Sequence, residues 1–312
     1  MATKAKSSSS SCLSFLKDAL LLPTKNAKLF VPVFLLVTAP LILLQITNVF
    51  YIQPRTADML HHINEVKNMD PSSADYAKLM VEIMKEAKEL AMISIALLVI
   101  TFAGSFAKQI IAFFATSTTY AGDRYSFPEL FTKVIMKGRH LRGPLITVAM
   151  VGVLNVACAL LLAALLQLAM RQLGVLYTAI LFVLPFLAFL YLDVVFFVAV
   201  AASVADEDSR GVSALRLAWR LMTRVCRKEG FVLVVAVHLV AMVPSLLYAV
   251  ALACLKKNMP MGLALFSVYA LLSGLVQLFY FAGIMVYYYL AMESKEVMAH
   301  DYVNIPTVEA TV

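Results

Sequence analysis

The chain has 312 residues, of which 62% are hydrophobic and only 14% charged, and its mean hydropathy is +0.86. A soluble domain needs far more surface charge, so this composition excludes a soluble globular protein and predicts a membrane protein. The formal net charge of +7 points to anionic lipid headgroups as partners rather than nucleic acid, because the basic residues flank the apolar segments.

Six apolar segments are long enough to cross a hydrocarbon core, which takes about 20 helical residues. We therefore expect an all-α, six-span membrane domain over 14–292, with a disordered cytosolic tail at 1–13 and a second cytosolic tail at 293–312. A tight turn is expected at 171–174, where two segments nearly meet. The six predicted spans lie at about 29–51, 90–115, 144–170, 175–204, 231–254 and 263–291.

Most of the 26 Lys and Arg residues lie in the N-terminal tail and in the loops at 116–143 and 205–230. The positive-inside rule therefore predicts that both termini are cytosolic. On the other side, the sequence from Asp70 to Ser73 predicts a helix start, so the second span is expected to continue out of the membrane as one long helix.

A short basic amphipathic helix is predicted before each pair of spans, beginning at Ser14, Ser126 and Ser213. Such helices are typical of the headgroup plane, with apolar residues in the acyl boundary and basic residues toward phosphate. Two interpretations remain open: the helices bind anionic lipids, or they only anchor the topology. The basic residues expected to face anionic lipid are Arg216, Arg220, Arg224 and Arg227 in the third helix and Lys133 and Lys137 in the second.

Four polar side chains on four predicted spans fall about 10–17 Å from the cytosolic ends, so they form one intramembrane layer. Charged residues inside spans are costly and therefore mark candidate functional sites. The layer either lines an aqueous pocket or proton path, or it is a buried ion pair with hydrogen-bonding neighbours that fixes helix packing. Its members are Lys108, Asn155, Asp193 and His238.

Sequence motifs of common enzymes are missing, including G-x-S-x-G, the Walker loop and H-E-x-x-H, so we expect no enzymatic activity. The adjacent pair His61 and His62 lacks the spacing of a metal site and is assigned to an exposed loop, and no metal or cofactor is expected. In the C-terminal tail, Tyr302 and Ile305 fit a tyrosine-based sorting motif, which binds as an extended strand.

The segment from Ala115 to Leu130, with 142–147, resembles a plant family of uncharacterised six-pass membrane proteins. So do the segment from Val204 to Met222, the lead-in at 14–20 and Pro40. The residue pattern acidic-Gly-x-x-Ala-Leu is remotely similar to a pattern in the membrane domain that is attached to some bacterial glycerophosphodiester phosphodiesterases. The catalytic domain of those enzymes has no counterpart here. The resemblance implies a fold and a class, and no catalytic residue.

Together these features predict a non-enzymatic multi-pass membrane protein that organises lipids or unidentified protein partners through its basic helices. The alternative is a small-solute or ion transporter that uses the intramembrane polar layer. The expected location is the endomembrane system or the plasma membrane. A plastid is less favoured, although the Ser-rich N-terminus shares the composition of a transit peptide.

Overall fold

The computed structural model describes residues 14–136, 141–206, 208–255 and 257–303, and within them it is helical, without a strand. Six helical segments are long and apolar enough to cross a membrane. They are Ala27–Val66, Ala74–Tyr120, Arg142–Gln172, Tyr177–Ala205, Arg227–Leu255 and Met259–Glu296. The six predicted spans are thus confirmed as helices of spanning length, and their ends extend beyond the predicted bounds except at the start of the fourth.

The chain divides into two compact units, and four helices contribute residues to both. Unit 1 comprises residues up to Phe34, Gln109–Ser245 and the chain from Leu275 onward; unit 2 comprises Leu35–Lys108 and Leu246–Gly274. The shared helices are α2 (Ala27–Thr47), α4 (Ala74–Tyr120), α8 (Arg227–Leu255) and α9 (Met259–Val303).

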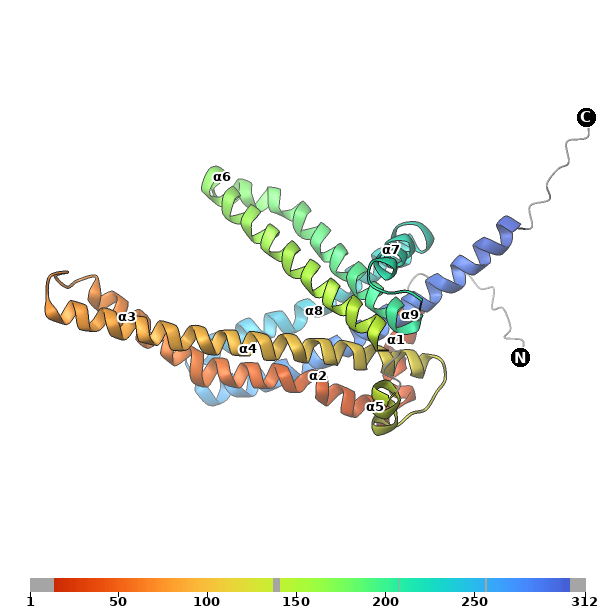
Figure 1. The fold of residues 1–312 in the computed structure, drawn as a ribbon, viewed down its shortest axis with the longest axis horizontal. Helices are drawn as coiled ribbons and strands as arrows, with labels where there is room; N and C mark the ends of the chain where they lie inside the picture. The colour runs from red at the N-terminus through yellow and green to blue at the C-terminus, as the bar shows by residue number, and fades with distance from the viewer. Residues whose placement is uncertain (1–13, 137–140, 207, 256, 304–312) are drawn as a thin grey trace, which may run out of the picture. The chain divides into compact units, whose positions relative to one another are not determined.

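The longest element of unit 1 is α6 (Arg142–Ala205), which carries the third and fourth candidate spans (Figure 1). A straight helix would place Asn155 and Asp193 about 57 Å apart, at 1.5 Å per residue. Their side chains are instead hydrogen-bonded at 2.9 Å, so the two halves of α6 fold back on each other. This confirms the expected reversal between the third and fourth spans.

Three short elements precede the paired spans: α1 (Ser14–Lys25), α5 (Phe127–Met136) and α7 (Val212–Arg220). At the start of α5 the Ser126 N–H donates to Glu129 Oε2 at 2.8 Å, which is one of the two hydrogen bonds of a capping box. The third basic helix is interrupted. A π-helical turn, η2 (Leu221–Val225), follows α7, and α8 begins at Arg227.

The core of unit 1 lies along the C-terminal half of α9, where residues 281–288 are all buried. Phe15 of α1 packs edge-on against Tyr287, with ring centroids 6.4 Å apart. The Tyr287 hydroxyl donates to the Cys226 carbonyl oxygen at 3.2 Å, which ties α9 to the break between η2 and α8. Burial raises the pKa of the Cys226 thiol, so this cysteine is a packed, neutral side chain.

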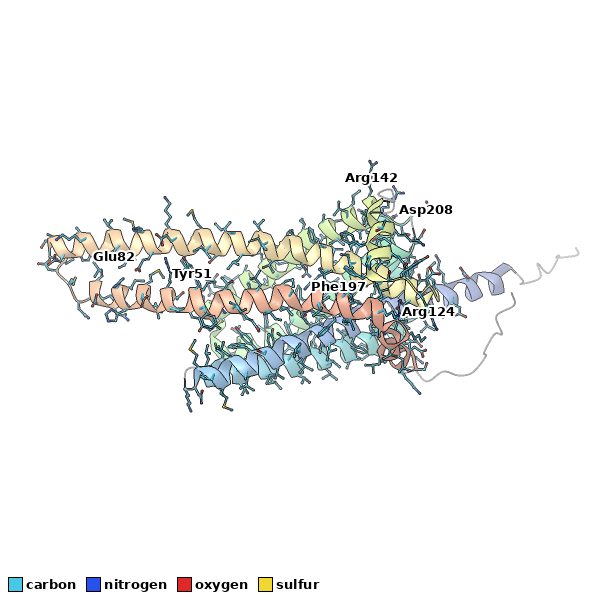
Figure 2. All side chains as sticks on the ribbon, turned by 90° about the horizontal axis from the view of Figure 1, so that it is seen from below. Tyr51, Glu82, Arg124, Arg142, Phe197 and Asp208 are labelled. Carbon is cyan, nitrogen blue, oxygen red and sulfur yellow. The ribbon has the colours of Figure 1, made fainter. Side chains whose placement is uncertain are left out.

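In unit 2 the chain after α2 continues through the π-helical turn η1 (Asn48–Ile52) into α3 (Gln53–Val66). Figure 2 shows α3 beside the start of α4, and it labels Tyr51 of η1 and Glu82 of α4. Arg55 pairs with Glu89 at 2.5 Å, and the Ser73 hydroxyl caps α4 by accepting from the Tyr76 N–H. The helix start at 70–73 and the long second helix are therefore confirmed, whereas α3 was missed by the sequence analysis.

Candidate functional site

A polar network in unit 1 is centred on the Asp193 carboxylate. Asn155 Nδ2 donates to Asp193 Oδ1 at 2.9 Å, and the Tyr280 hydroxyl donates to Asp193 Oδ2 at 3.1 Å. The three residues come from the two halves of α6 and from α9, and each is partly buried. The structure thus brings together two of the four residues predicted for the intramembrane layer.

Aromatic packing holds Tyr280 in this position. Phe197 lies one helical turn after Asp193, and its ring meets the Tyr280 ring edge-on with centroids 4.9 Å apart. Phe281 packs beside both, with its centroid 6.3 Å from Phe197 and 5.1 Å from Phe113 of α4. The aromatic cluster therefore orients the tyrosine hydroxyl toward the carboxylate, and Figure 2 marks Phe197.

Tyr280 was missed by the sequence analysis, which considered only charged, amide and imidazole side chains. Tyr280 lies about eleven residues before the end of the sixth predicted span, at the level of Asp193, so its depth in the sequence already places it in the same layer. A buried tyrosine hydroxyl usually has a hydrogen-bond partner, so the residue type also carried a signal.

His238 on α8 lies close enough to Asp193 for the two to interact electrostatically. Its Nδ1 is 2.8 Å from the Val234 carbonyl oxygen one turn earlier, a contact that places the ring proton on Nδ1 and leaves Nε2 as an acceptor when the ring is neutral. The fourth predicted member, Lys108, is the last residue of one unit-2 segment, whereas the network lies in unit 1. Its membership in the layer stays a prediction.

Chemically, the network is a carboxylate that accepts one hydrogen bond on each oxygen from a neutral donor. Within the part of the chain that the structure describes, Asp193 forms no ion pair. A buried carboxylate is costly unless a cation stabilises it, and His238 is a cation only when its ring is protonated. The arrangement therefore suits a carboxyl group that holds a proton or receives a cation, and it suits equally a hydrogen-bonded tie between α6 and α9.

A second feature of unit 1 is the basic face, defined here as Arg216, Arg220, Arg224 and Arg227. All four side chains are exposed, on α7, on η2 and at the first residue of α8. None of them forms an ion pair among the described residues. Trp219, also exposed, packs edge-on against Tyr191 with centroids 6.4 Å apart.

The apolar stripe between these arginines is used differently from the sequence expectation. Ala218, Leu221 and Met222 are fully buried inside the protein, because α7 and η2 pack against other elements of unit 1. The same holds for Phe15 and Ala19 of α1 and for Leu130 of α5. The periodicity of an amphipathic helix shows only that one of its faces is apolar, and not what covers that face. Here other parts of the protein, rather than lipid, cover much of it.

In α5, Lys133 is exposed and lies over the Tyr125 ring, with its Nζ 3.8 Å from the centroid. Lys137, the other basic residue assigned to this helix, lies outside the described residues. Tyr302 falls in the last turn of α9, and Ile305 of the same sorting motif is outside the described residues.

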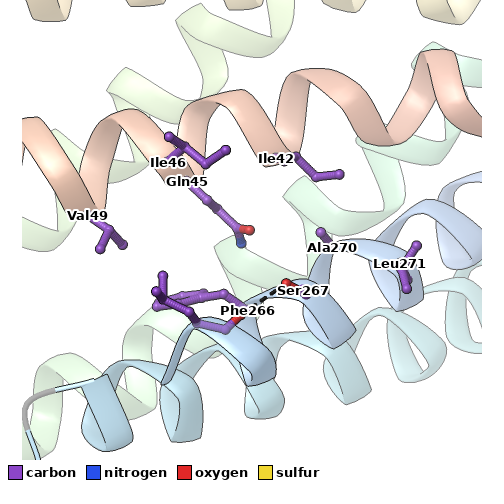
Figure 3. A pocket seen from close by; sticks show the side chains of 9 residues that line it. Ile42, Gln45, Ile46, Val49, Phe266, Ser267, Ala270 and Leu271 are labelled. Atoms are coloured by element: carbon purple, nitrogen blue, oxygen red, sulfur yellow. Dashed lines mark hydrogen bonds between the residues drawn. The ribbon is translucent and has the colours of Figure 1, made fainter. Parts of the chain in front are cut away.

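Unit 2 contains an apolar cavity of about 260 Å³ between residues of α2, η1 and α9 (Figure 3). Gln45 projects into it, and its Nε2 is buried without a hydrogen-bond partner in the described chain. Ser267 is satisfied internally, since its hydroxyl donates to the Leu263 carbonyl oxygen at 3.0 Å.

Potential metal ligands gather at one place among the described residues. Side-chain atoms of His61, His62 and Glu65 lie within 4.8 Å of one another. These residues are on α3, not in the loop expected from the sequence. His61 contacts Glu65 at 3.5 Å, and His62 is 3.3 Å from Glu86 of α4, so the group also functions as part of the α3–α4 packing.

A family model described as Domain of unknown function (DUF8558) matches residues 10–295, and the chain belongs to this family. No curated protein and no solved structure matches the chain. The comparison thus supports the expectation of an uncharacterised family covering most of the chain. It contains nothing on a plant source or on glycerophosphodiester phosphodiesterases, so those two parts of the expected resemblance have no support from it.

Proposed function

We propose that this protein is a non-enzymatic, six-span membrane protein that binds anionic lipid headgroups and thereby organises lipids or protein partners. The basic face would lie on the cytosolic side, together with both termini, in the endomembrane system or plasma membrane. The observation that carries the proposal is the row of exposed arginines on α7, η2 and α8, which form no ion pair with any residue that the structure describes.

Membrane insertion is supported by the apolar side chains that the helices leave uncovered. Leu184 of α6 is 76% exposed and Leu98 of α4 is 70% exposed, and many leucines and valines along the candidate spans resemble them. Soluble monomers rarely leave contiguous apolar surface of this extent. A bilayer would cover it, and the length of each segment suits a hydrocarbon core of about 30 Å.

Lipid binding is supported by the position of the arginines beside the start of the fifth candidate span. A basic residue near an anionic membrane surface contributes about 1 kcal/mol of attraction. Guanidinium groups also form bidentate hydrogen bonds with phosphate, which lysine cannot do. Because the intervening apolar residues are buried in the protein, the arginines are held on one side of a packed element.

The test uses purified protein reconstituted into phosphatidylcholine nanodiscs with and without phosphatidylserine. Arg216, Arg220 and Arg224 are replaced together by Gln, and bound lipid is measured by mass spectrometry. We expect the triple variant to lose its enrichment of phosphatidylserine. A matched control replaces Lys67, Lys85 and Lys88, which lie in and beside the α3–α4 hairpin, by Gln. Enrichment that is unchanged in the arginine variant would rule out the proposal.

A second candidate function, proton- or cation-coupled transport, is favoured by one observation: Asp193 is held by two neutral donors from different helices. Proteoliposomes loaded with a pH-sensitive dye would test it under an imposed potential. Asp193→Asn should abolish proton uptake while keeping the fold, and Asp58→Asn, an exposed change on α3, serves as the control. Equal uptake by wild type and Asp193→Asn would exclude this function for the network.

A further inference from the structure

A small polar cavity lies in unit 1 where the α1–α2 junction meets the turn after α4. Its volume is about 210 Å³, more than ten times the ~15 Å³ that one water requires. Asn26 joins the two segments, since its Nδ2 donates to the Tyr125 carbonyl oxygen at 3.0 Å across 99 residues of sequence. The cavity is lined by Lys25, Asn26, Thr119, Gly122, Asp123 and Arg124, and Figure 2 marks Arg124.

One residue that lines this cavity, Thr119, has a buried hydroxyl with no partner among the described residues. Thr119 is only 6% exposed, and its Oγ1 has no hydrogen-bond partner in the described chain. The neighbouring Thr116 and Thr118 both donate to helix carbonyl oxygens one turn earlier, at 2.9 Å. A buried hydroxyl left unpaired costs about 1–3 kcal/mol, so a group that enters the cavity and bonds to it would recover that cost.

The cavity also carries more positive than negative charge. Lys25 lies on one side and Arg124 on the other, both exposed, and neither forms an ion pair among the described residues. Asp123 is the single carboxylate. The last carbonyl oxygens of α4 are occupied, because Asp123 N–H donates to Thr118 and Gly122 N–H donates to Thr119. Gly122 makes this turn at a φ of +92°, which a side chain would disfavour.

We propose that this cavity binds a phosphate group. The Arg124 guanidinium and the Lys25 ammonium contact the phosphate oxygens, and the Thr119 hydroxyl donates a third hydrogen bond. Asp123 accepts from a hydroxyl of the molecule that carries the phosphate, so hydroxylated phosphate esters are preferred. The phosphate belongs to a lipid headgroup or to a soluble phosphate ester. This site is separate from the basic face and does not depend on it, because it uses none of the four arginines on α7, η2 and α8.

The experiment has two arms with one set of variants. In the first, protein in phosphatidylcholine nanodiscs with or without phosphatidylinositol 4-phosphate is examined for bound lipid by native mass spectrometry. In the second, titration calorimetry in phosphatidylcholine nanodiscs measures the affinity for inorganic phosphate and for glycerol 3-phosphate. The variants are Lys25→Gln with Arg124→Gln, and Thr119→Val, which removes the hydroxyl and keeps the shape. Lys28→Gln, an exposed neighbour outside the cavity, is the control.

We expect the charge variant and Thr119→Val each to weaken binding by about tenfold or more, which corresponds to about 1.4 kcal/mol, while Lys28→Gln has no effect. Thr119→Val should also unfold no earlier than wild type without ligand, because its hydroxyl makes no hydrogen bond. Binding that the variants weaken only in the mass-spectrometry arm, which measures phosphatidylinositol 4-phosphate, identifies a lipid phosphate. Binding that they weaken in the calorimetric arm identifies a soluble phosphate ester.

The proposal is overturned when both variants bind like wild type in both arms, or when neither arm shows phosphate binding by the wild-type protein. Replacing Arg216, Arg220 and Arg224 by Gln separates the two proposals. If lipid binding is lost only in that triple variant, the cavity is not a phosphate site and the basic face binds the lipid. If it is lost only in the cavity variants, the cavity is the phosphate site and the basic face does not bind the lipid.

Discussion

Asn155 and Asp193 lie 38 residues apart and are joined by a hydrogen bond of 2.9 Å. This bond can form only if the two halves of α6 run antiparallel. A single side-chain contact therefore joins the third and fourth candidate spans. Tyr280 extends the same network to α9 through the second oxygen of the carboxylate. One carboxyl group therefore links the two halves of α6 to each other and to α9.

Replacing Asn155 by Leu should loosen this pairing. The change removes one of the two donors to Asp193, and interhelical hydrogen bonds in membrane proteins contribute about 0.6 kcal/mol on average and about 1.7 at most. We expect the free energy of unfolding in detergent, measured by denaturant titration, to fall by an amount in this range. Val156→Leu, at the exposed neighbouring position, should leave it unchanged. Equal stability of Asn155→Leu and wild type would show that the bond does not hold the hairpin.

Gly262 should tolerate no side chain. A Cβ there would lie 2.6 Å from Leu255 Cα and 2.8 Å from Leu255 N, and these backbone atoms cannot move aside cheaply. Overpacking of this kind costs about 1–3 kcal/mol. The measurement is the thermal midpoint of Gly262→Ala in detergent, which should fall.

Gly104→Ala is the matched control in the same unit, because a Cβ at Gly104 meets nothing within 4 Å. Alanine is also favoured over glycine inside a helix by about 1 kcal/mol. Gly104→Ala should therefore keep or raise the midpoint. A fall in the control as large as that of Gly262→Ala would mean that the close approach of α8 and α9 is not the cause.

Glu129 should make the start of α5 sensitive to acid. The Ser126 N–H donates to the Glu129 carboxylate and lowers the pKa of that group below its ordinary value of 4.5. Because the pKa is lower in the folded state, the stabilisation is present above the unfolded pKa and is lost as the pH falls through the folded pKa. We therefore expect Glu129→Gln to be less sensitive than wild type to acid below about pH 4.5.

The measurement for Glu129 is thermal unfolding in detergent at pH 7 and at several values below pH 4.5. Glu82→Gln is the control, since Glu82 is exposed on α4 and forms no hydrogen bond or ion pair within the described chain. If acid lowers the unfolding temperature of Glu129→Gln, wild type and Glu82→Gln by the same amount, the hydrogen bond between Ser126 and Glu129 is not the cause of the acid sensitivity.

Cysteine labelling should report the topology. With the native cysteines replaced by alanine, Asn68→Cys in the turn between α3 and α4 should react with an impermeant maleimide added outside intact cells. Ser213→Cys in α7 should react only after the membrane is opened. The basis is the positive-inside distribution of Lys and Arg. The opposite pattern of labelling would invert the orientation and place the basic face outside the cytosol.

Several features of the fold follow from local sequence. Spanning length is a count of apolar residues, so all six helical segments were predicted, and the reversal in α6 followed from the short polar interruption at 171–174. The cap at Ser73 followed from a hydroxyl residue placed just before an apolar helix, and the bond between the Ser126 N–H and Glu129 followed from a glutamate three residues after a serine. Each of these depends on interactions within a few residues.

The sequence by itself predicted the six helices of spanning length, their order and a candidate layer of Lys108, Asn155, Asp193 and His238, because hydropathy and depth are properties of one segment at a time. Only the tertiary structure decided what those residues contact. It selected Tyr280 as the second donor to Asp193, buried Leu221 and Met222 in the protein, and left Thr119 unpaired beside Arg124. The physical reason is that the spacing of apolar residues along a helix decides which of its faces is apolar, whereas the neighbour that covers this face comes from a distant part of the chain.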